Sequence, residues 1–201
     1  MATLSESTIA ALLEPYLAGE GTPTLYGQLS LYLDLLVKWN ARMNLTAIQE
    51  PEEMVRRHFG ESLFAGRHLA PTATLLDFGS GAGFPGLPIQ LLRPEIAVTL
   101  AESQNKKATF LREVVRTLRL KTEVWSDRVE TMPEPRKFGA VALRAVDRMD
   151  VALPAAEKRV AEGGQLVILT TSEAIQGECQ RIPLPNSATG VLCLKMFHVE
   201  Q

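Results

Sequence analysis

The segment Thr74–Pro88, TLLDFGSGAGFPGLP, changes its physical character within a few residues. Thr74, Leu75 and Leu76 are β-branched or apolar and predict a short buried strand. Glycine tolerates positive φ angles and lets a ligand approach the main chain closely. The segment therefore predicts a strand that leads into a ligand-binding loop, because four glycines follow within eight residues: Gly79, Gly81, Gly83 and Gly86.

Two residues beside the glycines support this prediction. Pro85 suits the first turn of a following helix, whose free N–H groups attract polar or anionic ligands. Asp77 ends the strand, and we expect its carboxylate to point into the same crevice. In an open α/β sheet, ligands bind at the carboxyl ends of the strands.

The glycines fit two nucleotide-binding patterns. Read from Gly81, GAGFPG matches the dinucleotide pattern G-x-G-x-x-G. Read from Asp77, DFGSGAG matches D-x-G-x-G-x-G, the loop of class I methyltransferases that bind S-adenosylmethionine. A dinucleotide fold places its first glycine directly after the strand, whereas four residues from Asp77 to Ser80 intervene here, which favours the methyltransferase pattern. A glycine-rich turn without a ligand is the third alternative.

The composition is that of an ordinary globular protein. The 201 residues suffice for one large domain, or for one domain with a small appendage. No apolar run approaches the roughly 20 residues that span a bilayer, and the N-terminus lacks a basic signal region. We therefore expect a cytoplasmic protein with no membrane partner. Cys179 and Cys193 show no metal-binding spacing, and we expect buried apolar residues, neither a zinc site nor a disulfide.

Positive charge is concentrated in one part of the chain. The formal net charge is −2, which argues against binding nucleic acid with the whole surface. Residues 103–148, however, carry eleven Lys and Arg against six Asp and Glu. This excess predicts a local footprint for a polyanion, with solvated helix faces as the alternative.

The hydrophobic periodicity divides the chain into two regions. Residues 1–70 predict a helical N-terminal region, with helices over 5–19, over 22–42 and from Pro51 toward Ser62. Residues 71–201 alternate strands with helices and predict an α/β, Rossmann-like domain with a mostly parallel sheet. Its predicted strands are 74–78, 97–101, 122–125, 139–143, 165–170 and 191–197, the last antiparallel at the edge. A short predicted helix follows the glycine loop and ends at 92, and two further helices span 104–120 and 151–160.

Polar residues at the predicted strand ends are candidates for the site. Glu102 follows the second strand, where a carboxylate commonly binds ribose hydroxyls. Lys106 and Lys107 lie in the first turn of a helix, which disfavours positive charge, so a phosphate is a candidate partner and packing over apolar surface is the alternative. Asp127 is a candidate cap, and the Val129 and Glu130 backbone lies where an adenine edge would rest.

Further candidates come from Arg144 and from the N-terminal region. Arg144 ends a buried strand and needs either a carboxylate partner or a ligand. His58 is either structural or part of a site. Asn40, Asn44 and Thr46 are either helix-capping residues or functional ones.

Together, DFGSGAGFPGLP, ESQNKKATFLR, DRVE and RAV, with WNxxxNLT and RHFGES upstream, resemble the RsmG (GidB) family of ribosomal RNA methyltransferases. The resemblance covers roughly residues 25–170. It implies a class I methyltransferase fold behind a helical N-terminal region, and methyl transfer from S-adenosylmethionine to guanine N7 of 16S (small-subunit) ribosomal RNA. Separately from the resemblance, we expect a monomer and no metal.

The resemblance also implies roles for particular residues. Cofactor contacts are expected at the glycine loop with Asp77, at Phe84, Val129, Glu130 and Arg144, and at Glu102 for the ribose. Lys106, Arg128 and Arg144 are expected to face RNA or the target guanine. His58 is a further catalytic candidate, which the resemblance does not place. Leu143 and the run ILTTSEA depart from the family pattern, and the second departure removes an expected substrate-side lysine.

The sequence shows no obvious general base and no motif of other base methylations, and both absences agree with methylation at N7. Guanine N7 has a free lone pair and needs no general base, and we identify no obvious one. The motifs of exocyclic-amine and cytosine C5 methylation are absent from the sequence. Two other classes of function stay open, namely an NAD-dependent oxidoreductase and a non-catalytic RNA-binding module.

The last six residues, MFHVEQ, lead to a hypothesis about the gene. They can be encoded by ATGTTCCACGTGGAACAG, which contains the palindrome TGTTCCACGTGGAACA. This palindrome resembles the centromere-like sites of chromosome-partitioning proteins, next to whose genes this family is often found. Other codons at these positions would contradict the hypothesis.

Overall fold

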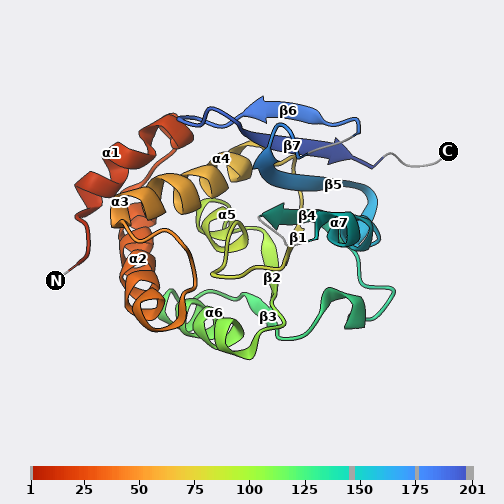
Figure 1. The fold of residues 1–201 in the computed structure, drawn as a ribbon, viewed down its shortest axis with the longest axis horizontal. Helices are drawn as coiled ribbons and strands as arrows, with labels where there is room; N and C mark the ends of the chain where they lie inside the picture. The colour runs from red at the N-terminus through yellow and green to blue at the C-terminus, as the bar shows by residue number, and fades with distance from the viewer. Residues whose placement is uncertain (1, 145–147, 175–176, 198–201) are drawn as a thin grey trace.

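The computed structural model describes residues 2–144, 148–174 and 177–197. Seven strands form one sheet in the order β3-β2-β1-β4-β5-β7-β6 (Figure 1). The strands from β3 to β5 are parallel, and β7 is antiparallel to both β5 and β6. The strand bounds are Thr74–Phe78 (β1), Ala97–Ala101 (β2), Glu123–Trp125 (β3), Phe138–Arg144 (β4), Val160–Thr171 (β5), Gln180–Pro183 (β6) and Gly190–Met196 (β7).

Helices cover both faces of this sheet. Most lie on one side, and α7 lies on the other (Figure 1). Their bounds are Glu6–Leu17 (α1), Pro23–Met43 (α2), Pro51–Glu53 (α3), Glu61–His68 (α4), Gly86–Leu92 (α5), Asn105–Thr117 (α6) and Met149–Glu157 (α7), with a π-helix over Met54–Gly60 (η1) and a 3-10 turn over Val129–Thr131 (η2).

The two faces of the sheet belong to separate hydrophobic clusters. Leu75 of β1 packs with the N-terminal helices, α5 and α6, whereas its neighbour Leu76 packs with α7 and the η2 turn. This alternation is expected of a strand buried on both faces. The N-terminal helices share their core with the sheet, and the boundary near residue 70 stays a prediction.

The third predicted helix is longer and less regular than expected. α3, η1 and α4 follow one another without a break, so the helical path runs from Pro51 to His68. Seven residues of it are wound as a π-helix, and such segments occur frequently at functional sites. Hydrophobic periodicity does not distinguish such local changes of winding.

Two features near the C-terminal end, namely a further strand and a disulfide, differ from the sequence-based expectations. β6 was not expected; it lies outside β7, and Pro183 at its end is tolerated because edge strands need fewer hydrogen bonds. The expectation for the cysteines was wrong, because Cys179 and Cys193 form a disulfide. The β6–β7 pairing, which the sequence did not predict, brings them together. The tail residues 198–201 lie outside the described chain.

Among the described residues, no helix is long and apolar enough to cross a membrane.

Candidate functional site

The glycine loop leaves β1 and turns tightly before α5. Gly79, Gly81 and Gly83 have φ angles of +71°, +56° and +93°. The Ser80 N–H donates to the carbonyl of Ala101 at 2.9 Å, which fastens the loop to the end of β2. At Gly83 an added Cβ would lie 2.4 Å from the Tyr32 hydroxyl, so this position requires glycine for space as well as for φ.

Tyr32 of α2 anchors the loop from the N-terminal region. Its buried hydroxyl donates to the carbonyl of Ala82, and its ring stacks on Phe84 with centroids 5.4 Å apart. Tyr32 is 0% exposed. The helical N-terminal region thus helps to fix the loop backbone.

Glu102 lies where the sequence predicted a ribose acceptor, and it also shapes the loop. Its Oε2 accepts from the Gly81 N–H at 2.9 Å, and its Oε1 accepts from the Gln104 N–H at 2.8 Å. A carboxylate oxygen has more than one lone pair, so both atoms can accept a further hydrogen bond. A ligand hydroxyl group can therefore bind here without displacing the loop.

Asp77 points in a different direction from the one expected. The carboxylate is fully buried and accepts from the Gly86 N–H at 2.9 Å, at the start of α5. Burial raises the pKa of Asp77 to about 7. Asp77 therefore ties β1 to α5 beneath the loop and does not line the crevice.

Arg144 extends from the end of β4 toward the N-terminal region. Its guanidinium donates to the carbonyls of Arg57 and His58 at 2.8 and 3.2 Å, and to Glu61 Oε2 at 2.7 Å. A weaker contact reaches the Ser62 hydroxyl at 3.4 Å. Arg144 thus has a buried carboxylate partner, which is one of the two alternatives that the sequence left open. Ala145 and Val146 of the RAV run lie outside the described residues.

His58 of η1 lies between Arg144 and the glycine loop. Its Nε2 is 2.7 Å from the Thr46 hydroxyl, and its ring stacks on Phe84 with centroids 4.8 Å apart. Burial, followed by the charges of Arg144 and Arg57, lowers the pKa of His58 to about 3. The imidazole is therefore neutral at pH 7 and a weak base.

The glycine loop, Glu102, Arg144 and His58 border a cavity of about 420 Å³, which we call the glycine-loop cavity. It lies at the carboxyl ends of β1, β2 and β4, as expected for a parallel α/β sheet. Its lining consists of Leu45, Thr46, His58, Gly79, Ser80, Gly81, Ala82, Phe84, Glu102, Gln104, Lys107 and Arg144.

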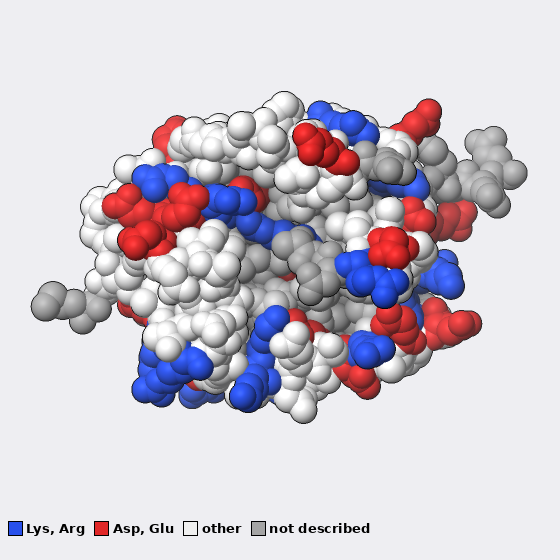
Figure 2. Space-filling model, in the orientation of Figure 1, with Lys and Arg blue, Asp and Glu red and all other residues white. Residues whose placement is uncertain are grey.

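A second cavity of about 420 Å³, the hairpin cavity, lies next to it. Both cavities are lined by His58 and Arg144, which form a shared wall. The hairpin cavity extends to the end of β5 and to the turn between β6 and β7. Figure 2 shows Lys and Arg side chains bordering a hollow in the middle of this face, with acidic side chains gathered over α3.

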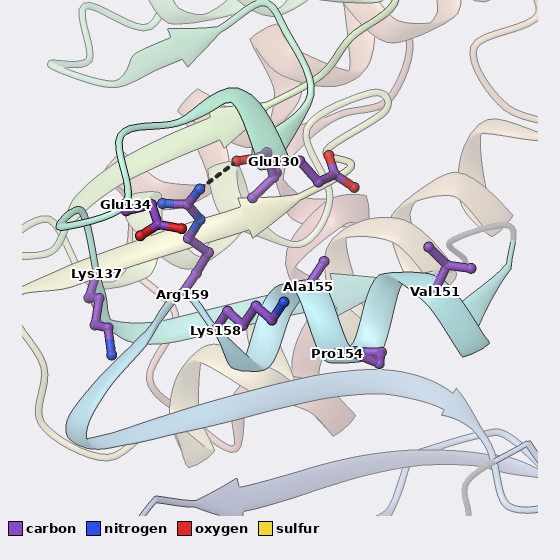
Figure 3. A pocket seen from close by; sticks show the side chains of 9 residues that line it. Glu130, Glu134, Lys137, Val151, Pro154, Ala155, Lys158 and Arg159 are labelled. Atoms are coloured by element: carbon purple, nitrogen blue, oxygen red, sulfur yellow. Dashed lines mark hydrogen bonds between the residues drawn. The ribbon is translucent and has the colours of Figure 1, made fainter.

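Asp77 and Gly83 are buried and do not line the glycine-loop cavity, and four further predicted site residues lie away from it. Lys106 and Arg128 are exposed and line neither cavity. Val129 and Glu130 line a third cavity of about 490 Å³ between η2 and α7. Figure 3 shows Arg159 reaching from the end of α7 toward η2, where its Nη2 donates to the Val129 carbonyl at 3.0 Å. Their proposed contacts with RNA or adenine stay predictions.

Comparison with known proteins identifies the family of this chain. A family model described as "GidB: rRNA small subunit methyltransferase G" matches residues 25–191. The chain belongs to the GidB family.

Individual members of the GidB family support the same conclusion. A ribosomal RNA small subunit methyltransferase G from Chromobacterium violaceum is 42% identical over 142 residues, which cover 70% of this chain and 68% of that protein. The protein of that name from Xanthomonas oryzae pv. oryzae strain KACC10331 is 37% identical over 163 residues, covering 80% and 76% of the two chains.

Solved structures support the class I methyltransferase fold. The Thermus thermophilus 16S rRNA N2 G1207 methyltransferase RsmC superposes with a TM-score of 0.53 at 18% identity, covering 90% of this chain and 44% of that one. TYW2 from Pyrococcus horikoshii superposes with a TM-score of 0.56 at 14% identity, covering 70% and 62%. These likenesses concern the fold alone.

The structure adds residues to the candidate site of this GidB protein. Thr46, which the sequence left between a capping and a functional role, binds His58 and lines the cavity. Lys107, rather than its neighbour Lys106, faces the cavity. Ser80 and Gln104 also line it, and only their closeness to the glycine loop and to Glu102 in the sequence could have indicated this.

Proposed function

We propose that this protein transfers a methyl group from S-adenosylmethionine to N7 of a guanine in small-subunit ribosomal RNA, in the cytoplasm. The supporting observation is that residues of the glycine loop, of the ESQNKK and RHFGES runs and Arg144, which lie far apart in the sequence, line one cavity at the carboxyl ends of the strands. Neither the oxidoreductase nor the non-catalytic alternative is favoured by the family match.

The glycine-loop cavity fits the proposed cofactor. An added Cβ at Gly81 would find only the Gly79 carbonyl within 4 Å, so the main chain there is open to a ligand. Glu102 would bind the ribose hydroxyls, and the Phe84 ring and Leu45 offer apolar surface. When bound, S-adenosylmethionine supplies a methyl group on a positively charged sulfur.

The chain's own residues would position the guanine rather than activate it. Arg144 stands in the wall between the two cavities and is held by two backbone carbonyls and Glu61, so its position is fixed before substrate arrives. Such pre-alignment can contribute several kcal/mol to catalysis. His58 is a weak base, which suits N7, because this atom carries a lone pair and no proton.

The experiment that tests the proposal follows methyl transfer directly. The protein is incubated with S-adenosylmethionine and either bare 16S ribosomal RNA or small subunits, and nucleosides are analysed by mass spectrometry for 7-methylguanosine. We expect Arg144→Ala to lower the rate by about a hundredfold, because misplaced groups cost that much. Arg148→Ala, an exposed control paired with Asp150, is expected to keep the parental rate.

Binding measurements separate the proposal from the alternatives. Isothermal titration calorimetry is expected to detect S-adenosylhomocysteine binding and no NAD binding. Binding of NAD alone would favour the oxidoreductase. RNA binding without methyl incorporation would favour the non-catalytic module.

A further inference from the structure

The hairpin cavity has a lining suited to a flat ring with polar edges. Its apolar part comes from Ile48, Leu169 and Leu184, and hydroxyl groups come from Thr170 and Thr171 at the end of β5. Binding sites for flat aromatic ligands combine an apolar lining with a few polar groups that fix orientation. The volume of about 420 Å³ falls within the range of small-molecule sites.

The position of this cavity connects it to the proposed chemistry. His58 and Arg144 separate it from the glycine-loop cavity, so a ring inside it would lie beside the place proposed for the cofactor. Enzymes that modify a stacked base commonly extrude it into such a pocket. We propose that the hairpin cavity receives the extruded target guanine and that Arg57 binds the phosphate of that nucleotide; this inference rests on the proposed function.

The two arginines of the cavity differ in what they can still bind. Arg144 is 10% exposed in its side chain, and its guanidinium is occupied by Glu61 and backbone carbonyls. Arg57 is 57% exposed, and its Nε donates to Glu61 Oε1 at 3.3 Å. A guanidinium has five N–H donors, so Arg57 can bind Glu61 and a phosphate together. Arg57 is therefore the phosphate ligand, and Arg144 is part of the wall.

The charges at the cavity agree with a single phosphate group. Arg57 and Arg144 share Glu61, and His58 is neutral at pH 7, so these four groups leave one net positive charge. The end of β5 adds hydroxyl groups from Thr170 and Thr171 and no charge of its own. The run ILTTSEA at the end of β5 lacks the substrate-side lysine that the resemblance led us to expect. Arg57 can supply a positive charge in its place.

Two pairs of variants test the inference. Arg57→Gln removes the proposed phosphate ligand; Arg56→Gln is its control, because Arg56 is also basic, lies on the same helix and pairs with Glu52 outside the cavity. Thr171→Trp fills the cavity; Glu173→Trp is its control, because Glu173 is exposed and does not line it.

The measurements are methylation kinetics on bare 16S ribosomal RNA and on small subunits at several salt concentrations, with the affinity for S-adenosylhomocysteine alongside. We expect Arg57→Gln to raise the KM for RNA about tenfold, as for the loss of one charge-assisted hydrogen bond. The slope of log KM against log salt should fall by about 1. Thr171→Trp should lower kcat/KM by at least about tenfold, the scale of a lost specific contact. S-adenosylhomocysteine affinity should stay parental in both, and both controls should behave as the parent.

Several results would overturn the inference. Parental kinetics in Arg57→Gln and Thr171→Trp would remove the base pocket while leaving the proposed function intact. An equal loss of S-adenosylhomocysteine binding and of methylation would show that these residues act through the cofactor site. A parent protein that methylates neither RNA nor subunits would overturn the proposed function and this inference together.

Discussion

Arg144 at the end of β4 and Glu61 in α4 form a buried ion pair, with 2.7 Å between Nη2 and Oε2. Their side chains are 10% and 9% exposed. The pair joins the sheet to the helical N-terminal region and brings the RHFGES motif to the Arg144 motif. Two sequence patterns more than 80 residues apart therefore act as one structural unit.

Removal of this carboxylate is expected to destabilise the protein. Glu61→Gln leaves the buried charge of Arg144 without its ionic partner, and breaking such a pair costs about 3–5 kcal/mol. Urea unfolding should show a loss of about 3 kcal/mol, the lower end, because backbone carbonyls still hold the guanidinium. Glu52→Gln, which breaks an exposed pair with Arg56, should change stability by about 0.5 kcal/mol or less. Equal effects of the two substitutions would contradict this account.

The sequence predicted much of the sheet because its strands have clear local signals. The strand at 74–78, the glycine loop and the strand at 97–101 match the observed β1, loop and β2. Glu102 and Arg144 were predicted to lie at the carboxyl rim, and both line the glycine-loop cavity. Such positions follow from the parallel α/β arrangement alone.

Other features depend on contacts between distant parts of the chain. The carboxylate of Asp77 turns away from the crevice because the Gly86 N–H lies beneath the loop. The Cys179–Cys193 disulfide depends on the pairing of β6 with β7. The side of α6 that faces the cavity carries Lys107 rather than Lys106. The local sequence does not show which way a side chain points or which distant residue it meets.

Gly83 is expected to tolerate alanine much less than Gly19. Both have positive φ, +93° and +86°, so alanine is strained at either position. An added Cβ at Gly83 would also collide with the Tyr32 hydroxyl, whereas nothing lies within 4 Å at Gly19. We expect thermal unfolding to show a loss of about 1 kcal/mol for Gly19→Ala and at least about 3 kcal/mol for Gly83→Ala. Similar losses would mean that the loop can move away from Tyr32.

The Tyr32 hydroxyl is expected to matter for cofactor binding although it does not line the cavity. Tyr32→Phe leaves the Ala82 carbonyl without its partner, which costs about 1–3 kcal/mol for a buried group. Because Ala82 lines the glycine-loop cavity, calorimetry should show several-fold weaker binding of S-adenosylhomocysteine. The control is Tyr26→Phe, because the Tyr26 hydroxyl lies beside Gly21, between α1 and α2. This variant should bind S-adenosylhomocysteine as the parent does. Unchanged affinity in Tyr32→Phe would show that the loop holds its shape without this bond.

The disulfide is expected to stabilise the oxidised protein. Cys179 and Cys193 are 14 residues apart, and closing a loop of this length contributes about 3 kcal/mol in the chain-entropy description. Dithiothreitol should therefore lower the free energy of unfolding by about 2–3 kcal/mol. Cys179→Ser should not respond to the reductant. Two titratable thiols in the native, unreduced protein would contradict the pairing.

Asp77 and His58 should affect the pH dependence of stability in opposite directions. Burial lowers the pKa of His58 from 6.5 to about 3, so its contribution is present above pH 6.5 and is lost as pH falls toward 3. Burial raises the pKa of Asp77 from 3.8 to about 7, so its contribution is present at low pH and is lost as pH rises toward 7. In the parent protein the two trends offset each other between pH 3.8 and pH 6.5, where both contributions change with pH.

Asp77→Asn should isolate the contribution of Asp77 to the pH dependence, because His58 is common to the variant and the parent. The amide keeps an acceptor for the Gly86 N–H and does not titrate, so the falling contribution disappears. Stability of the variant relative to the parent should rise by roughly 2 kcal/mol between about pH 5 and about pH 6.5, near the limit of 1.4 kcal/mol per pH unit. His58→Gln should show the reverse trend, and groups common to all three proteins cancel in the difference. Urea unfolding across this range measures it, and a flat difference for Asp77→Asn would mean that Asp77 is already ionised in the folded protein.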